Sequence, residues 1–102
     1  MNNWVLVTVK YTVKPGKRDE FYQKVAREGI IEDSKAEAGN IKYEYSASLD
    51  SRDVLCLLEI WDSAESQMRH GQTPHYQKLQ ALKSEYVTNV AVEKYVISER
   101  SS

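Results

Sequence analysis

The sequence predicts an α+β fold of the ferredoxin-like type, with the element order β-α-β-β-α-β and helices on one face of an antiparallel sheet. Two observations support this: alternating apolar and polar residues at both ends and in the middle of the chain, and helical periodicity between them. A chain of 102 residues is long enough for one core and too short for two. We therefore expect a single domain over residues 1–102, with a polar tail at 98–102 that frays.

The first strand is predicted over residues 4–13, where valines and Tyr11 alternate with Leu6, threonines and a lysine. A Lys-Pro-Gly turn follows at residues 14–16, and apolar positions with a helical period begin after it. We expect one long helix that starts at Lys17 and stops at Gly39, because glycine readily adopts the left-handed conformation of a helix end.

Two strands are predicted in the middle of the chain. Residues 41–49 alternate between apolar and polar side chains, and a turn at residues 50–53 leads into the next strand. Residues 54–61 are apolar at nearly every position, which is typical of a central strand covered on both faces. Cys56 is the only cysteine and lies in this run, so we interpret it as a buried packing residue rather than a nucleophile.

Two further helices and a strand complete the fold. Asp62 is a suitable N-cap, with Glu65 three residues later as in a capping box, so a short helix is predicted to run to about His70. Thr-Pro then restarts a helix over residues 74–85, since proline is favoured at the first helical position. Residues 86–97 are rich in Val, Tyr and Thr and are predicted to form the last strand.

Apolar side chains on both faces of the sheet predict a second copy of the chain. Helices on one face leave Trp4 and Leu6 of the first strand uncovered. Each large side chain removed from water contributes about 1.5–3 kcal/mol, so covering a handful of them is a substantial gain. We predict a homodimer with a two-fold interface. On the third strand, the sequence leaves open which set faces the partner: Leu55, Leu57 and Trp61, or Val54, Cys56, Leu58 and Ile60.

Composition argues against several classes of partner. The 14 Lys and Arg nearly balance the 15 Asp and Glu, and no block of like charge is present, so no nucleic-acid partner is expected. The start MNNWVLVTV lacks the features of a signal peptide, and no run approaches the roughly 20 apolar residues of a membrane span. We expect a soluble, cytoplasmic protein that does not bind membranes.

The candidate site lies in LEIWDSAESQMRHGQTPHYQKL, residues 58–79, which contains both histidines. His75 lies on the apolar stripe of its helix and should point inward, while His70 ends the preceding helix, so opposite helix-end fields suit them to acid and base roles. Glu59 and Trp61 share one strand face, and a carboxylate there must pair, take up a proton or face a wet cavity. If that face looks toward the helices, the four side chains converge on one pocket.

Each of these residues also has a purely structural interpretation. His75 and His70 are then local helix-end residues, Trp61 is packing, and Glu59 pairs with a lysine. A metal site is not expected, because the five-residue histidine spacing is not the i, i+4 arrangement and no third ligand follows from spacing. Glycine-rich phosphate loops and dinucleotide fingerprints are absent from the sequence.

Three segments resemble one known family. They are KPGKRDEF, EAGNIKYEYS and, most specifically, the segment of residues 58–79 with its E-x-W and H-x-x-T-P-H patterns. Together they are similar to the antibiotic biosynthesis monooxygenase domain family, whose members are small dimeric α+β barrels. These include quinol monooxygenases and the isomerase that processes phosphorylated autoinducer-2.

The resemblance implies a pocket between the sheet and the broken helix, and often oxidation of a quinol or polyphenolic substrate by O₂ without flavin, haem or metal. In this scheme His70, His75 and Glu59 supply the base and the hydrogen bonds, and Trp61 and Tyr76 form apolar walls. Two alternatives stay open: an isomerase acting on a small keto sugar phosphate, and a non-catalytic dimeric module for ligand binding or stress response.

Overall fold

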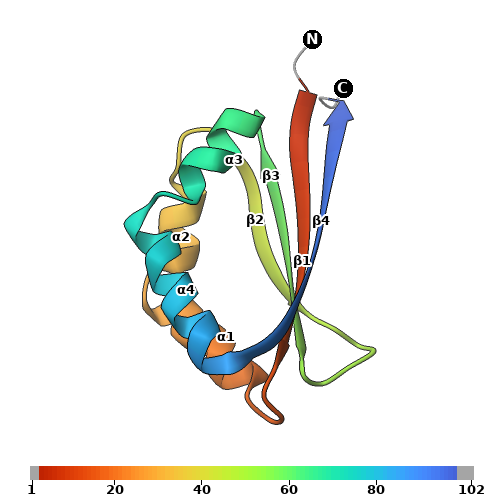
Figure 1. The fold of residues 1–102 in the computed structure, drawn as a ribbon. Coiled ribbons are helices and arrows are strands. Elements are labelled where there is room, and N and C mark those ends of the chain that lie inside the picture. The colour runs from red at the N-terminus through yellow and green to blue at the C-terminus, as the bar shows by residue number, and fades with distance from the viewer. Residues whose placement is uncertain (1–2, 99–102) are drawn as a thin grey trace.

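A computed structural model describes residues 3–98 of the protein. It confirms the predicted ferredoxin-like α+β architecture (Figure 1). Four antiparallel strands form one sheet in the order β2-β3-β1-β4, and the helices lie on one of its faces. The elements are β1 (Asn3–Val13), α1 (Arg18–Arg27), α2 (Ile30–Lys35), β2 (Asn40–Ala47), β3 (Val54–Trp61), α3 (Ala64–His70), α4 (Pro74–Tyr86) and β4 (Val87–Ser98).

The strand register shows which side chains face the helices. β3 lies between β2 and β1, as predicted for a central strand, and Leu57 pairs with Val9. Odd-numbered residues of β3, and of β1 from Val7 onward, point to the helices, where they are buried, and even-numbered residues point to the outer face. The open question for β3 is thereby settled: its outer face carries Val54, Cys56, Leu58 and Ile60. Cys56 is therefore half-buried within one chain, not fully buried as predicted.

The long helix predicted from Lys17 to Gly39 is in fact two helices. α1 ends at Arg27, and α2 begins at Ile30, because Gly29 between them has a φ of 80° in the left-handed region. The apolar period continues across this break and does not reveal it. The change of direction brings the end of α2 and the following loop toward α3.

The predicted N-cap of α3 is also corrected. Ser63, not Asp62, is the N-cap, and its side chain accepts a hydrogen bond from the backbone N–H of Ser66 at 3.1 Å. Asp62 is still held to the loop before β2, because its backbone N–H donates to the carbonyl of Gly39 at 2.8 Å. Its carboxylate instead accepts a hydrogen bond from the Ser66 hydroxyl at 2.6 Å.

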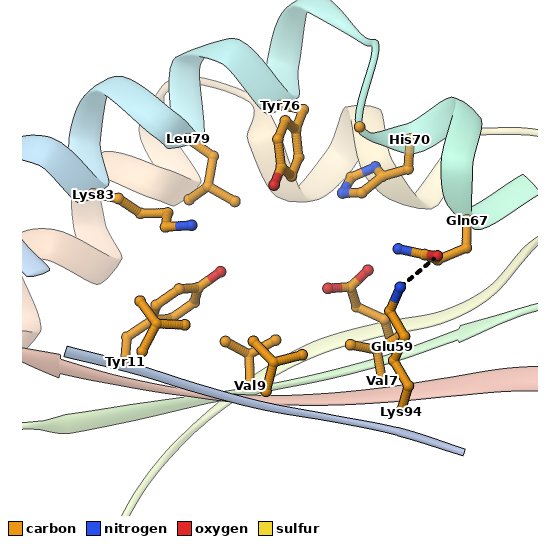
Figure 2. A pocket seen from close by; sticks show the side chains of 13 residues that line it. Val7, Val9, Tyr11, Glu59, Gln67, His70, Tyr76, Leu79, Lys83 and Lys94 are labelled. Carbon is orange, nitrogen blue, oxygen red and sulfur yellow. Dashed lines mark hydrogen bonds between the residues drawn. The ribbon is translucent and has the colours of Figure 1, made fainter.

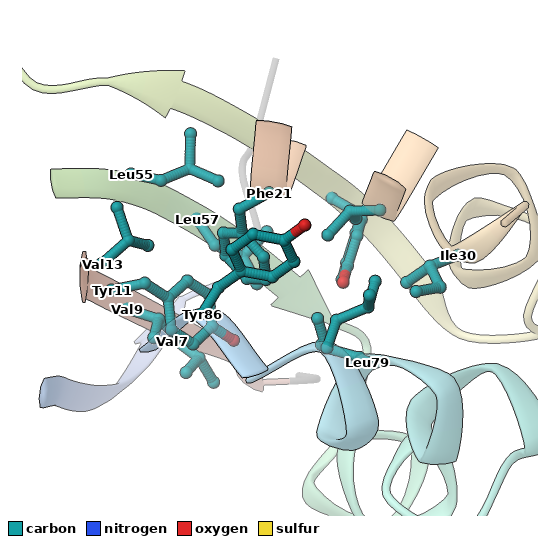
Figure 3. Packing of buried hydrophobic residues seen from close by; sticks show 13 residues of the cluster. Val7, Val9, Tyr11, Val13, Phe21, Ile30, Leu55, Leu57, Leu79 and Tyr86 are labelled. Carbon is teal, nitrogen blue, oxygen red and sulfur yellow. The ribbon is translucent and has the colours of Figure 1, made fainter. Parts of the chain in front are cut away.

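The core lies between the helices and the inner face of the sheet (Figure 3). Phe21 of α1 occupies its centre, with ring centroids 5.8 Å from Tyr11 and 5.7 Å from Tyr86. In contrast, β4 is exposed over most of its length. Ser98 belongs to this strand rather than to the fraying tail, and the rest of that predicted tail lies outside the described residues. Among residues 3–98, no helix is both long and apolar enough to cross a membrane.

Gly39→Ala should destabilise the fold by about 2–4 kcal/mol, because a left-handed backbone and a steric clash act together. Gly39 has a φ of 91°, and an added Cβ would lie 2.7 Å from the Asp62 carboxylate and closer still to the Ser66 hydroxyl. Urea denaturation measures the loss. Gly16→Ala is the matched control, with a φ of 77° and nothing within 4 Å, and equal losses in the two variants would contradict the steric argument.

Candidate functional site

A cavity of about 240 Å³ lies between the inner face of the sheet and helices α3 and α4 (Figure 2). β1 and β3 form its floor, α4 forms its roof, and the end of α3 closes one side. The side toward β4 is less covered, since Val90 and Val92 are 38% and 53% exposed. The lining residues are Val7, Val9, Tyr11, Glu59, Gln67, His70, Gly71, Tyr76, Leu79, Lys83, Val90, Val92 and Lys94.

His70 is fixed at the end of α3, with its ring directed at the cavity (Figure 2). Its backbone carbonyl accepts a hydrogen bond from the Thr73 hydroxyl at 2.7 Å, and Thr73 is also the N-cap of α4. The ring is buried, and its centroid lies 4.8 Å from that of the Trp61 ring and 5.3 Å from that of the Tyr76 ring. The joint between the two helices therefore sets the position of the imidazole.

Glu37, which the sequence analysis missed, binds both histidines. One carboxylate oxygen, Oε2, lies 2.5 Å from His70 Nδ1 and 2.7 Å from His75 Nε2. An ionised carboxylate only accepts hydrogen bonds, so the contacting nitrogen of each ring carries the proton. In a neutral His70 this leaves Nε2 unprotonated, and a base of this kind can take a proton from a group in the cavity.

His75 is buried as predicted but does not line the cavity. It lies behind His70, with the two ring centroids 5.7 Å apart, and reaches Glu37 instead. The side chains of these three residues form what we call the Glu-His-His triad. The prediction that all four candidates meet in the pocket is thus corrected, since neither His75 nor Trp61 lines it.

Glu37 also supplies a third possible metal ligand beside the two histidines, which the histidine spacing did not suggest. The three potential ligand atoms of the triad lie within 4.8 Å of one another. A metal ion holds nitrogen and oxygen ligands at about 2.0–2.2 Å, which separates those ligands by roughly 3 Å or more. The two Glu37 contacts of 2.5 and 2.7 Å are shorter and match charge-assisted hydrogen bonds. We therefore interpret the triad as a hydrogen-bonded unit.

Glu59 lies on the cavity floor and is only 7% exposed. Burial raises the pKa of its carboxyl, while the Trp61 indole N–H opposes this by donating to Oε1 at 3.0 Å. Trp61 is itself fully buried beneath the cavity, so it supports Glu59 rather than forming a wall. Tyr76, by contrast, lines the cavity as the resemblance implied.

Four further polar residues of the cavity were not predicted: Tyr11, Gln67, Lys83 and Lys94. They come from β1, α3, α4 and β4, so no local motif connects them. The available signal was weak: Lys83 lies four residues after Leu79 and shares its helix face. Burial lowers the pKa of Lys83 and raises that of Tyr11.

Glu59→Gln should make the protein relatively more stable as pH rises. In the folded state the pKa of Glu59 lies above the ordinary value of 4.5. The folded protein therefore binds more protons than the unfolded chain from about pH 4.5 upward, and wild-type stability falls through the folded pKa. Glutamine is always neutral, and its carbonyl can still accept from Trp61. Urea unfolding at several pH values measures the difference between variant and wild type.

The control is Glu32→Gln, which replaces an exposed carboxylate on α2. A stability difference between Glu59→Gln and wild type that stays constant from pH 4 to pH 8 would contradict a raised carboxyl pKa in the folded protein.

Comparisons with known proteins identify the family. The sequence model of the family described as antibiotic biosynthesis monooxygenase matches residues 4–82. The chain belongs to this family. It is also 31% identical over 65 residues to "Putative monooxygenase YcnE" of Bacillus subtilis (strain 168), a match covering 64% of this chain and 66% of that protein, just under two thirds of its length.

Solved structures share the fold of this antibiotic biosynthesis monooxygenase family member. A conserved protein from Methanosarcina mazei Go1 has a TM-score of 0.83 at 27% identity, covering 94% of each chain. Rv0793 from Mycobacterium tuberculosis also has a TM-score of 0.83, at 26% identity, covering 97% of this chain and 99% of that one. The family match includes the Glu-His-His triad and Glu59 but ends before Lys83 and Lys94.

Proposed function

We propose that this family member is a cofactor-independent monooxygenase that oxidises a quinol or polyphenolic aromatic substrate with O₂. The observation that supports this best is His70, a buried imidazole whose Nδ1 contacts Glu37 and whose ring lines the cavity between the sheet and α3–α4. A base in this position can deprotonate a phenol, and a phenolate is a far better electron donor to O₂ than the neutral phenol. The substrate thus supplies the electrons that a cofactor would otherwise provide.

The proposed reaction is balanced for hydroquinone, which with O₂ gives hydroxybenzoquinone and water. His70 Nε2 accepts the phenol proton, and the phenolate passes one electron to O₂, giving a phenoxyl radical and superoxide. The two radicals join through a new C–O bond at a ring carbon that carries hydrogen, and His70 returns its proton to the peroxide. The O–O bond then breaks, water leaves with the hydrogen of that carbon, and a carbonyl remains.

The other site residues support this base. Glu37 and His75 are positioning residues, because they orient His70 without lining the cavity. Glu59, whose pKa is raised by burial, hydrogen-bonds a substrate hydroxyl. Apolar walls formed by Val7, Val9 and Leu79 keep water from competing for the phenolate and the radical pair.

Oxygen uptake tests the proposal. The purified protein, stripped of metal with a chelator, is assayed against a panel of hydroquinones and anthrone-like phenols, with boiled protein as the control for autoxidation. We expect uptake above that background without added cofactor, and a product that contains one oxygen atom from ¹⁸O₂. No uptake with any member of the panel would contradict the proposed chemistry, and a sugar-phosphate isomerase assay would then follow.

We also propose that two copies pair through the outer face of the sheet. The side chains of Leu6, Leu58 and Ile60 are only half-buried on that face, which none of the helices described in residues 3–98 covers. Light scattering should give twice the 11.8 kDa of one chain. Leu58→Glu should shift the protein to monomer, because pairing would then bury a charge opposite its own copy. A wild-type monomer at micromolar concentration would overturn this proposal.

A further inference from the structure

Lys83 is the cavity residue that the proposed oxidation does not use. It lies on α4 and points into the cavity from the end opposite His70 (Figure 2). Its Nζ lies 5.5 Å from the centroid of the Tyr11 ring, an arrangement that holds the ammonium over an aromatic face. Leu79 and Tyr76 line the roof between Lys83 and His70 (Figure 2).

The ammonium of Lys83 has no hydrogen-bond acceptor in the part of the chain that the structure describes. Within residues 3–98 it forms neither a hydrogen bond nor an ion pair with a carboxylate. The other charged groups of the cavity are already engaged: Lys94 donates to Gln67 at 3.2 Å, and Glu59 accepts from the Trp61 indole. Burial lowers the pKa of Lys83, and the charge of Glu59 across the cavity opposes this only in part, so a half-buried ammonium with no direct anionic contact is costly. A bound anion would remove this cost.

We propose that Lys83 binds a carboxylate substituent of the substrate, so that the cavity selects phenolic acids over neutral phenols. This inference rests on the proposed function, because it names the substrate class of the same cavity. The hydroxyl that His70 deprotonates then lies at one end of the molecule and the carboxylate at the other. Lys83 acts as a specificity residue and takes no part in proton transfer.

A carboxylate fits this end of the cavity better than a phosphate does. A phosphate dianion usually takes several donors, such as arginine forks or a row of backbone N–H groups. Among the described residues the lining contains no arginine, and its other lysine, Lys94, donates to Gln67 near the His70 end. One ammonium matches one negative charge and leaves the apolar roof to contact the aromatic ring.

Calorimetry with a matched pair of ligands tests the inference. Under anaerobic conditions, which prevent turnover, wild-type protein is titrated with 2,5-dihydroxybenzoate and with its neutral methyl ester. Wild type should bind the acid roughly 10- to 100-fold more tightly, the contribution of one charge-assisted contact away from bulk water. Lys83→Met should reduce this ratio to about one, and Lys83→Arg, which keeps the charge, should retain most of it.

Lys78→Met is the matched control, because Lys78 lies on the same helix but is exposed and its Nζ contacts the backbone carbonyl of Glu28. It should leave the acid-to-ester ratio unchanged. Equal affinity of wild type for acid and ester, or a ratio that survives in Lys83→Met, would overturn the inference. Such a result would leave the proposed oxidation intact, because oxygen uptake with neutral hydroquinone does not depend on Lys83. Conversely, a preference for the acid in a protein that consumes no oxygen would leave Lys83 as a specificity residue and remove only the oxidation.

Discussion

Replacing His70 by alanine should lower the kcat/KM of oxygen uptake by about 10²- to 10⁴-fold, the usual contribution of a positioned general base. His70 is the imidazole that both lines the cavity and contacts the partly buried carboxylate of Glu37. Without it, a phenol in the cavity loses the imidazole that takes its proton and keeps only the weaker carboxylate base Glu59, so most electron transfer to O₂ starts from the neutral substrate. The measurement is oxygen consumption by the variant and by wild type with the same hydroquinone.

Added imidazole separates a chemical role of His70 from a structural one. The alanine variant leaves space beside Trp61 and Tyr76, which contact the ring in the wild type. We expect imidazole in the buffer to restore part of the activity, in proportion to its unprotonated fraction. Arg69→Ala, at the exposed neighbouring position, should retain nearly full activity. Full activity in the His70→Ala variant would refute the assignment of the base.

Glu37→Ala should reduce the free energy of unfolding by about 2–5 kcal/mol. One carboxylate oxygen serves both buried rings, so its removal leaves two N–H groups without an acceptor, each at a cost of about 1–3 kcal/mol. Urea denaturation of wild type and variant measures this loss. The same variant should also lose most of its oxygen uptake, because nothing then selects the His70 tautomer with a free Nε2.

Glu37→Gln and Glu32→Ala make the Glu37 result interpretable. Glutamine keeps the shape but offers one accepting oxygen without a charge, so it should be intermediate in stability and should lose activity more than stability. Glu32 is exposed on α2, just before the loop that carries Glu37, and its replacement should change stability by less than about 0.5 kcal/mol. A loss in Glu37→Ala as small as that of Glu32→Ala would show that the triad contributes no stability.

The order of elements was predictable because it depends on local patterns. The alternation of residues 4–13 and the apolar run of residues 54–61 are properties of consecutive residues, and both became strands of one sheet. The errors in the predicted helix boundaries lie where local backbone geometry or capping differs from what the residue pattern indicates. Gly29 divides the first helix through a positive φ. Ser63 rather than Asp62 is the N-cap of α3, and the Asp62 carboxylate accepts a hydrogen bond from the Ser66 hydroxyl instead.

The candidate site was predictable only in part. His70, Glu59 and Tyr76 lie in one stretch of 22 residues from Leu58 to Leu79, and the structure brings all three to the cavity. His75 lies in the same stretch, and its inward direction followed from the helical period. What it contacts did not follow, because the period gives a direction and not a partner.

The sequence by itself determined the strands, the order of the elements, the family and the inward direction of His75, since these depend on neighbouring residues or on a short motif. Only the tertiary structure decided that Glu37, 33 residues from His70 in the chain, joins the two rings. It also decided that Lys83 faces the cavity without a hydrogen-bond or ion-pair partner among the described residues 3–98. Both outcomes depend on how α2 and α4 pack against the sheet, and such distances between remote segments leave no periodic trace in the chain.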